Sequence, residues 1–419
     1  MLEYFYKERR TLVDFRRGPL GPHFDEFAAS LKEKGYVPAT AAQILSRCHQ
    51  FSHFLVERDV TQARSINPTL IESFLKVYLA GSRSSRPHIT NKSTRLALRH
   101  LFSYLVDCGV LTKSEPRLAC TPYSWALDPF LEHLRREREI SEHSVAQNSK
   151  IISAFLKGLG SQASRQALKG LRPESVEQYF RERIEGNCRN QVRMGSALRS
   201  FLRFCAVKRY TTQDLSGMVP PIPRYKLASL PRGIEDQAVK RLLATMPQGS
   251  MTGCRNYAMV LLMAAYGLRA AQVVKLRLED IHWPRSTIRI GAAKGGKEVL
   301  LPLLGSVGEA LLSYLRHRPA NSPFREVFLS VHAPFVPLSG LAVSLMTRIW
   351  LRKIGIKAPR AGSSMLRHSW AIRALAHDTS IKAIADVMGH RWLHTTFIYA
   401  KADLKTLRQA AASWPEAIR

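Results

Sequence analysis

Acidic residues are scarce in this chain of 419 residues, where 32 Asp and Glu face 63 Lys and Arg, a formal net charge of +31. So large a surplus does not decide the fold, but it favours a polyanionic partner, either nucleic acid or an anionic membrane surface. Long apolar runs are also missing. The longest, residues 259–265, is far shorter than the roughly 18–20 residues that span a bilayer, so no membrane-spanning helix is expected.

Cysteine is sparse as well. The six cysteines are scattered, and no two form a Cys-x-x-Cys pair. A disulfide framework or a cysteine-ligated zinc site is therefore not expected, and we predict no bound metal. The first residues lack the apolar stretch of a secretory signal. Together these absences predict a reducing compartment, the cytoplasm.

The composition is otherwise that of a globular protein, with 45% hydrophobic and 23% charged residues. Its length suggests two to four domains. The clearest boundary is the proline-rich stretch 217–232, which we interpret as an extended linker. Residues 1–228 hold 36 basic and 21 acidic residues, and residues 229–419 hold 27 and 11. Because both halves are basic, they can close around a DNA duplex; a membrane-binding helix would instead gather the charge on one face.

The N-terminal half contains an internal repeat of about 100–105 residues. Residues 66–74 resemble residues 171–179, and residues 97–104 resemble residues 197–204. Each copy predicts four helices, at 22–34, 39–57, 67–80 and 91–107, and at 128–138, 142–158, 173–185 and 190–208. We therefore predict a helical DNA-binding module at 1–118 and a second at 119–216. Two unrelated bundles with similar apolar periodicity are the alternative.

The C-terminal half, predicted as one domain over 233–419, is mixed. Two alternating segments, 286–290 and 298–303, flank a glycine-rich turn and predict a β-hairpin. Helices are expected at 236–246, 256–266, 306–317, 339–353, 366–377 and 381–388, with a final amphipathic helix at 402–414. The expected fold class is mainly α, with a small antiparallel β element.

Several residues of this half are candidates for chemistry. They are Arg269 in a Gly-Leu-Arg segment, Lys294 at the hairpin tip, Arg367 in a Leu-Arg-His segment, His390 after a glycine, and Tyr399 nine residues later. Taken singly, each has an ordinary interpretation as a surface, capping or core residue. Their joint order and spacing are far more specific.

In that order and at that spacing, these segments resemble the tyrosine recombinase family, the phage-integrase type that includes Xer-like enzymes. The resemblance covers about residues 229–412 and extends more loosely to the helical modules upstream. It implies a site-specific DNA recombinase that cleaves and rejoins DNA through a 3′-phosphotyrosyl intermediate, for integration, excision or transposition. It also implies double-stranded DNA as partner, a homo-oligomer (a dimer on one site, a tetramer in synapsis), no cofactor, and a nucleoid-associated protein in a prokaryotic cytoplasm. The helix at 402–414 would be the one that subunits exchange.

The chemistry of the residues agrees with these implied roles. Two guanidiniums, those of Arg269 and Arg367, match the geometry of a phosphate and stabilise the charge that builds on it. The phenol of Tyr399 can form the covalent adduct. Lys294 is a plausible general acid for the leaving 5′ oxygen, and His390 would hydrogen-bond the phosphate.

Two positions depart from the family pattern. Ser364 stands where the family usually has His, three residues before Arg367, and a hydroxyl is a poor proton acceptor near neutral pH. The base that takes the tyrosine proton is therefore open: water, His390 or His368, although the family residue matching His368 packs structurally. Gln272 stands where the family usually has an acid, so it can accept a hydrogen bond from Arg269 without neutralising it.

Three other functions fit parts of the sequence. A catalytically decayed DNA-binding or architectural protein would keep the charge and the helices, but the retained candidate residues argue against it. A type IB topoisomerase-like enzyme shares the chemistry but relaxes DNA as a monomer. The expected helix at 402–414 favours the recombinase instead, because it resembles the helix that recombinase subunits exchange. A metal nuclease is disfavoured because acidic residues are few after residue 229 and no His-Glu-x-x-His pattern occurs.

Overall fold

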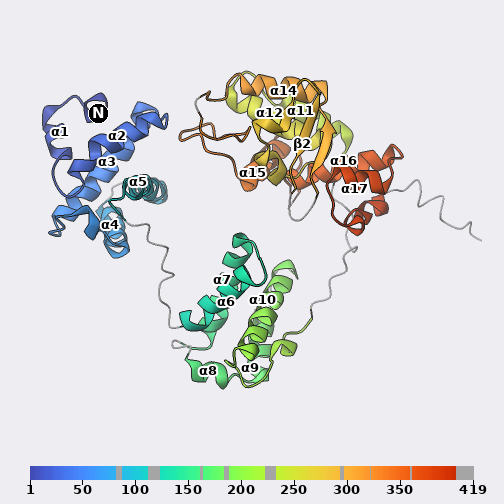
Figure 1. The fold of residues 1–419 in the computed structure, drawn as a ribbon, viewed down its shortest axis with the longest axis horizontal. Helices are drawn as coiled ribbons and strands as arrows, with labels where there is room; N and C mark the ends of the chain where they lie inside the picture. Colours follow the sequence, from blue (N-terminus) through green and yellow to red (C-terminus); the bar gives the residue numbers. More distant parts are fainter. Residues whose placement is uncertain are drawn as a thin grey trace, which may run out of the picture. The chain divides into compact units, whose positions relative to one another are not determined.

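The computed structural model describes residues 1–81, 87–111, 123–160, 164–183, 188–221, 233–292, 297–320, 322–358 and 361–402 (Figure 1). These residues are mostly helical and include one small antiparallel sheet, which confirms the predicted fold class. Residues 112–226 form one compact unit, and residues 1–111 and 227–419 fall in the other. The domain boundaries given above stay a prediction. Within the described residues, no helix has the length and apolarity to cross a bilayer.

The first helical module is built around phenylalanines. Its helices are α1 (Arg9–Phe15), α2 (Phe24–Glu33), α3 (Pro38–Val56), α4 (Pro68–Gly81) and α5 (Pro87–Asp107). Phe15, Phe24, Phe27 and Phe51 are fully buried in one hydrophobic cluster, together with Leu45, Leu55, Leu98 and Leu101. The sequence pattern predicted α2 to α5 within a few residues but not α1, which is only seven residues long.

The second module repeats this layout. Its helices are α6 (Ser124–Arg136), α7 (Glu142–Gly158), α8 (Arg165–Lys169), α9 (Pro173–Glu182) and α10 (Cys188–Val207). Leu198 and Phe201 on α10 are fully buried, as are the matching Leu98 and Leu101 on α5. Both α4 and α9 begin with proline, whose fixed φ suits the first helical turn. The two modules thus share a layout and core positions, and their origin by duplication stays a prediction.

The start of the predicted linker packs on this second module. Val219 is 2% exposed and belongs to its core. The Arg199 guanidinium donates to the carbonyl oxygens of Val219 and Pro220, at 3.2 and 3.3 Å. The rest of that segment, residues 222–232, lies outside the described residues.

The C-terminal half is organised around one buried helix, α12 (Met251–Tyr266), which packs against α14 (Gly305–Leu315) and α16 (Ser363–Ala376). The other helices are α11 (Asp236–Thr245), α13 (Ala270–Lys275), α15 (Gly340–Lys353) and α17 (Ile381–Val387). The strands β1 (Ile281–His282), β2 (Thr287–Ile290) and β3 (Val299–Pro302) pair antiparallel in that order. Ile288 on β2 lies between Ile281 and Leu301, and all three side chains are buried.

Two details of this half differ from the sequence prediction. Helix α12 begins at Met251 rather than at residue 256, because the Ser250 side chain accepts a hydrogen bond from the Gly253 N–H and caps the helix. The short α13 and β1 were not predicted. The predicted hairpin is present as β2 and β3, but its tip, with Lys294, lies outside the described residues. The same is true of most of the predicted helix at 402–414.

Candidate active site

Arg367 lies on α16 and is 7% exposed. Its Nη1 donates to the carbonyl oxygen of Gly267 at 2.6 Å, and its Nη2 donates to that of Met388 at 3.0 Å. The same Nη2 lies 2.7 Å from Nε2 of His390. One guanidinium thus joins the end of α12 to the turn after α17. Burial and the neighbouring Arg269 lower its pKa to about 9, so it still carries its charge at neutral pH.

His390 is held in one protonation state by these contacts. A guanidinium can only donate, so Nε2 of His390 accepts from Arg367. Its Nδ1 therefore carries the proton and donates to Oγ1 of Thr396, 2.7 Å away. Burial, together with the positive charges of Arg367 and Arg269, lowers the pKa of His390 to about 4. The imidazole is therefore neutral at neutral pH.

Arg269 follows a tight turn at the end of α12. Gly267 ends that helix with φ of +64°, and a Cβ there would lie 2.8 Å from the Trp370 ring, so glycine is required. The Arg269 backbone N–H donates to Oε1 of Gln272 at 3.0 Å. The guanidinium is half-buried, and its Nη1 is buried with no hydrogen-bond partner among the described residues. Burial lowers the pKa of Arg269, and Tyr399 partly opposes that shift.

The structure settles how Gln272 and Arg269 interact. The hydrogen bond expected between them is present, but it comes from the Arg269 backbone rather than from its guanidinium. Gln272 also donates from Nε2 to the carbonyl oxygen of Gly291, at 3.4 Å. It therefore ties the Arg269 turn to the base of the β2–β3 hairpin and leaves the guanidinium free of a carboxylate.

Tyr399 lies in a short 3₁₀ segment, Phe397–Ala402, and is 2% exposed. Its hydroxyl lies 3.0 Å from Nδ1 of His368, one residue after Arg367 on α16. Burial raises the pKa of Tyr399, and the charges of Arg367 and Arg269 act in the opposite direction. Burial and Arg367 lower the pKa of His368, so this imidazole is neutral and able to accept a proton.

Sequence reasoning favoured a packing role for His368, and the structure shows in addition that its ring contacts the Tyr399 hydroxyl. Ser364, one turn earlier on α16, is exposed, and its hydroxyl has no hydrogen bond within the described part of the chain. The side chain that meets the nucleophile candidate is therefore His368. His368 is visible in the sequence directly after Arg367, but only the folded structure places it beside Tyr399.

Lys294 lies outside the described residues, so only the residues on either side of its segment are described. The hairpin base meets the site on one side at Gly291, through Gln272. On the other side, a Cβ at Gly389 would lie 3.1 Å from the carbonyl oxygen of Lys297. The two ends of the segment that carries Lys294 are thus held beside Arg269 and His390. Of the six predicted site residues, Arg269, Arg367, His390 and Tyr399 come together; Ser364 is exposed on the same helix face as Arg367.

Comparisons with known proteins agree with this geometry. The phage integrase family matches residues 232–405, and the phage integrase N-terminal SAM-like domain matches residues 127–209. An integrase/recombinase, y4rA of Sinorhizobium fredii, is 33% identical over 99% of both chains. The tyrosine recombinase XerA of Pyrococcus furiosus is 27% identical and covers 68% of this chain and 93% of its own.

Solved structures show the same fold. XerH recombinase in a post-cleavage complex with palindromic difH DNA aligns with a TM-score of 0.55 at 16% identity, over 82% of this chain and 94% of XerH. A lambda integrase fragment in a dimer on a COC′ core site aligns with a TM-score of 0.51 at 16% identity, over 65% of this chain and 96% of the fragment. Residues 1–111 lie outside both family matches.

Proposed function

The chain belongs to the phage integrase family of tyrosine recombinases, and on that premise we propose that Tyr399 is the nucleophile with which it cuts DNA. The chain is a site-specific recombinase. The observation that carries the assignment of the nucleophile is the pairing of a buried phenol with a neutral imidazole, 3.0 Å apart, in the field of two arginines. A phenol in that setting is poised to lose its proton and attack a phosphate.

The two arginines stabilise the transition state in different ways. Arg367 is fixed by three hydrogen bonds, so its charge is held in place before the substrate arrives. Arg269 has a buried Nη1 without a partner among the described residues, a donor that a nonbridging phosphate oxygen would meet once the site is uncovered. The exposed hydroxyl of Ser364 can donate to the same phosphate. His390 orients Arg367 and, being neutral, adds no charge.

Proton transfer follows from the contacts of Tyr399. As its oxygen bonds to phosphorus, the phenolic proton passes to Nδ1 of His368, which takes the part that the family usually gives to the residue at 364. The bond from phosphorus to the 5′ oxygen breaks, and Lys294 protonates that oxygen. The products are a 3′-phosphotyrosyl enzyme and a free 5′-OH. Attack by the 5′-OH of another strand reverses these steps, so the bond energy is kept and no nucleotide is needed.

DNA must uncover the nucleophile before this chemistry begins. Tyr399 is 2% exposed, so no phosphate reaches its hydroxyl in the form seen here. We propose that the segment Phe397–Ala402 shifts when the enzyme binds its site, far enough to admit the phosphate while Tyr399 stays in contact with His368. Movement of that segment would couple cleavage to correct binding.

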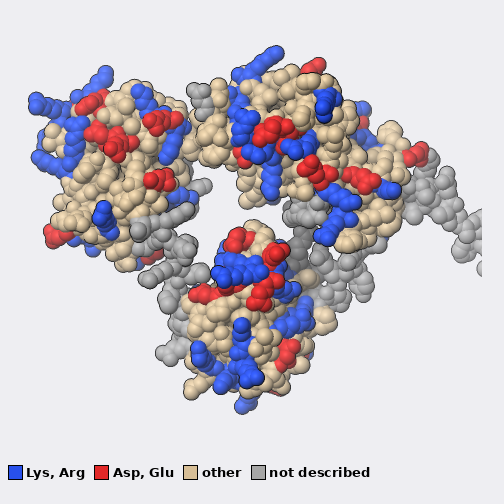
Figure 2. Space-filling model, in the orientation of Figure 1, with Lys and Arg blue, Asp and Glu red and all other residues tan. Residues whose placement is uncertain are grey.

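The proposed partner is double-stranded DNA, bound by a homodimer on one site and by a tetramer in synapsis, in the cytoplasm of a prokaryote. Lys and Arg side chains lie on each described part of the chain in the view of Figure 2, in keeping with the net charge of +31. The solved neighbours named above include DNA complexes and a dimer. Integration, excision and transposition all use this chemistry.

A nicked suicide substrate that carries the enzyme's own site tests the assignment. The native chain should form a covalent protein–DNA adduct in EDTA, joined through Tyr399 to a 3′ phosphate. Tyr399→Phe should bind the DNA and form none. Tyr266→Phe is the matched control: the Tyr266 hydroxyl only holds backbone groups, those of Pro302 and Leu304.

Three results would contradict the proposal. An adduct that persists in Tyr399→Phe would move the nucleophile elsewhere. A native chain that binds its site without forming any adduct would indicate a decayed enzyme. Relaxation of supercoiled DNA that lacks the site would indicate a topoisomerase-like activity.

A further inference from the structure

We propose that Asp14, His49 and His53 of the first helical module form a binding site for a divalent transition-metal ion, best suited to Zn²⁺. The described residues hold this one group of three His, Cys or acidic side chains whose ligand atoms all lie within 4.8 Å of one another. It lies in a different module from the recombinase site and is independent of the function proposed for Tyr399.

The geometry of the three ligand atoms fits a tetrahedral ion. His49 and His53 are four residues apart on α3, so their rings share one helix face, and Asp14 reaches them from α1. Oδ2 of Asp14 lies 3.1 Å from Nε2 of His53 and 3.4 Å from Nε2 of His49. Bonds of about 2.0–2.1 Å to a tetrahedral zinc ion place neighbouring ligand atoms roughly 3.3–3.5 Å apart. The two distances to Asp14 need little adjustment, and the imidazole nitrogens of His49 and His53 lie within 4.8 Å of each other.

A second observation points to a missing ligand. Nε2 of His49 is buried and has no hydrogen-bond partner among the described residues, although it faces the Asp14 carboxylate. A buried polar atom without a partner is costly, and metal coordination removes that cost. The His49 ring is stacked on Phe15, with centroids 4.1 Å apart and planes at 28°, so it is held in orientation without the metal.

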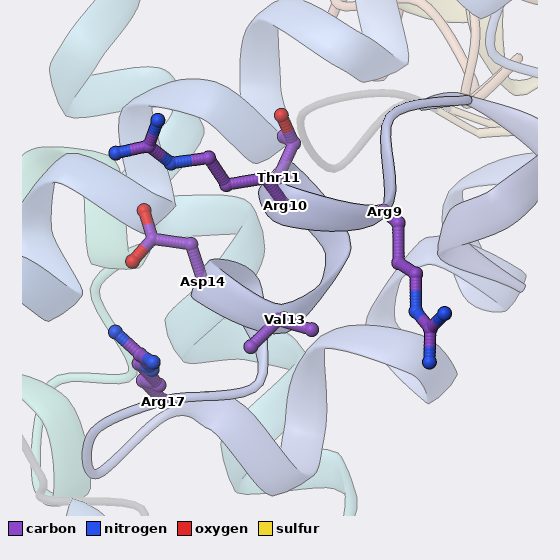
Figure 3. Close-up of a pocket in the computed structure, with 6 residues that line it drawn as sticks. All are labelled: Arg9, Arg10, Thr11, Val13, Asp14 and Arg17. Atoms are coloured by element: carbon purple, nitrogen blue, oxygen red, sulfur yellow. The ribbon is translucent and has the colours of Figure 1, made fainter.

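The donor set selects the class of ion. Two imidazoles and one carboxylate suit zinc and its neighbours, whereas Ca²⁺ and Mg²⁺ require more oxygen ligands. Asp14 also lines a cavity of about 750 Å³ on α1 with Arg9, Arg10 and Arg17 (Figure 3). These arginines repel any cation, so directed coordination by the three side chains must supply the affinity.

The bound ion would act as a cross-link. It would fasten the seven-residue α1, too short to be stable alone, to the long α3. Since the ion binds the folded module and not the unfolded chain, it should raise the stability of that module. Strand cleavage uses no group of this site, so it should continue without the ion.

The experiment uses the full chain, stripped with EDTA and dialysed, with Zn²⁺ followed by calorimetry and Co²⁺ by visible absorption. His53→Ala and Asp14→Asn remove one ligand each; the His53 side chain is 52% exposed, so its loss should not prevent folding. His143→Ala is the matched control, an exposed helical histidine whose partner is Gln147. Circular dichroism confirms that each variant is folded.

The native chain and His143→Ala should bind one more metal ion than either ligand variant, with an absorption typical of tetrahedral Co²⁺. Affinity at that position should fall at least tenfold in His53→Ala, and Zn²⁺ should raise the melting temperature of the native chain and of His143→Ala but not of the two ligand variants. Equal binding by native and His53→Ala chains would overturn the proposal. So would a native chain that takes up no ion at stoichiometric concentration, which would leave the three side chains as a hydrogen-bonded cluster.

Discussion

Replacing His368 with Asn tests whether this imidazole is the base for Tyr399. An Asn amide can occupy the position of Nδ1 and keep a hydrogen bond to the phenol, but it cannot take a proton. A positioned general base contributes about 10²–10⁴-fold to a rate, or roughly 3–5 kcal/mol in the activation free energy. The full loss is expected, because Nε2 of His390 is engaged by Arg367 and no other imidazole contacts the Tyr399 hydroxyl among the described residues.

The assay is single-turnover adduct formation on the suicide substrate between pH 6 and 9. Burial lowers the pKa of His368, so the native rate should be nearly flat over most of this range and fall only on the acid side. The rate of His368→Asn should instead rise steadily with pH, since the phenol must then ionise on its own and burial raises its pKa. DNA affinity should be unchanged.

A second substitution separates catalysis from packing. Ser364→His in the His368→Asn background puts an imidazole back one turn earlier on α16 and should recover at least tenfold in rate. His377→Asn, an exposed position at the end of α16, is the control and should behave as native. If His368→Asn cleaves within threefold of native with the same pH profile, His368 has only a packing role.

Three further outcomes are expected. Arg269→Lys should slow adduct formation about 10²–10³-fold, because an ammonium lacks the planar fork, with DNA affinity within threefold by gel shift. Acid should destabilise the fold, because the pKa of His390 is about 4 in the folded chain and about 6.5 in the unfolded chain. The stability that neutral His390 contributes is therefore complete above pH 6.5 and is lost as the pH falls toward 4. The melting temperature of His390→Gln should fall less steeply on acidification than that of the native chain. Gly267→Ala should lower the melting temperature by several degrees, because φ is positive there and the added Cβ would lie 2.8 Å from the Trp370 ring. Gly305→Ala is the control and should leave the melting temperature unchanged, because a Cβ at that position meets nothing within 4 Å.

The long helices were predictable because their burial is periodic. Leu98, Leu101 and Leu105 recur at helical spacing, and all three are buried on one face of α5. The start of α12 was not predictable from apolar spacing, since Ser250 sets it by capping. Short elements such as α1 and α13 carry too few residues to show a period, and neighbouring structure decides them.

The site was predictable in its residue types and only partly in its contacts. The order of Arg269, Arg367, His390 and Tyr399 along the chain indicated a shared site. The sequence did not indicate which imidazole meets the phenol, because that depends on how α16 packs against the segment that carries Tyr399. The metal-binding proposal shows the same limit: the spacing of His49 and His53 is visible in the sequence, but the third ligand lies on the unpredicted α1.

The candidate site differs from the rest of the fold in that it holds two neighbouring positive charges and a buried donor without a partner among the described residues. Arg367 and Arg269 lie close enough for each charge to disfavour the other, and a buried Nη1 of Arg269 has no partner in the described structure. Such an arrangement costs stability, since buried charges are normally paired with acids. Gln272 lies beside Arg269 where a carboxylate would have relieved that cost, and it bonds the backbone instead. A DNA phosphate, with its one negative charge, would offset part of this repulsion and satisfy the free donor. The unfavourable charge of this site is therefore itself an argument that the site binds the DNA backbone.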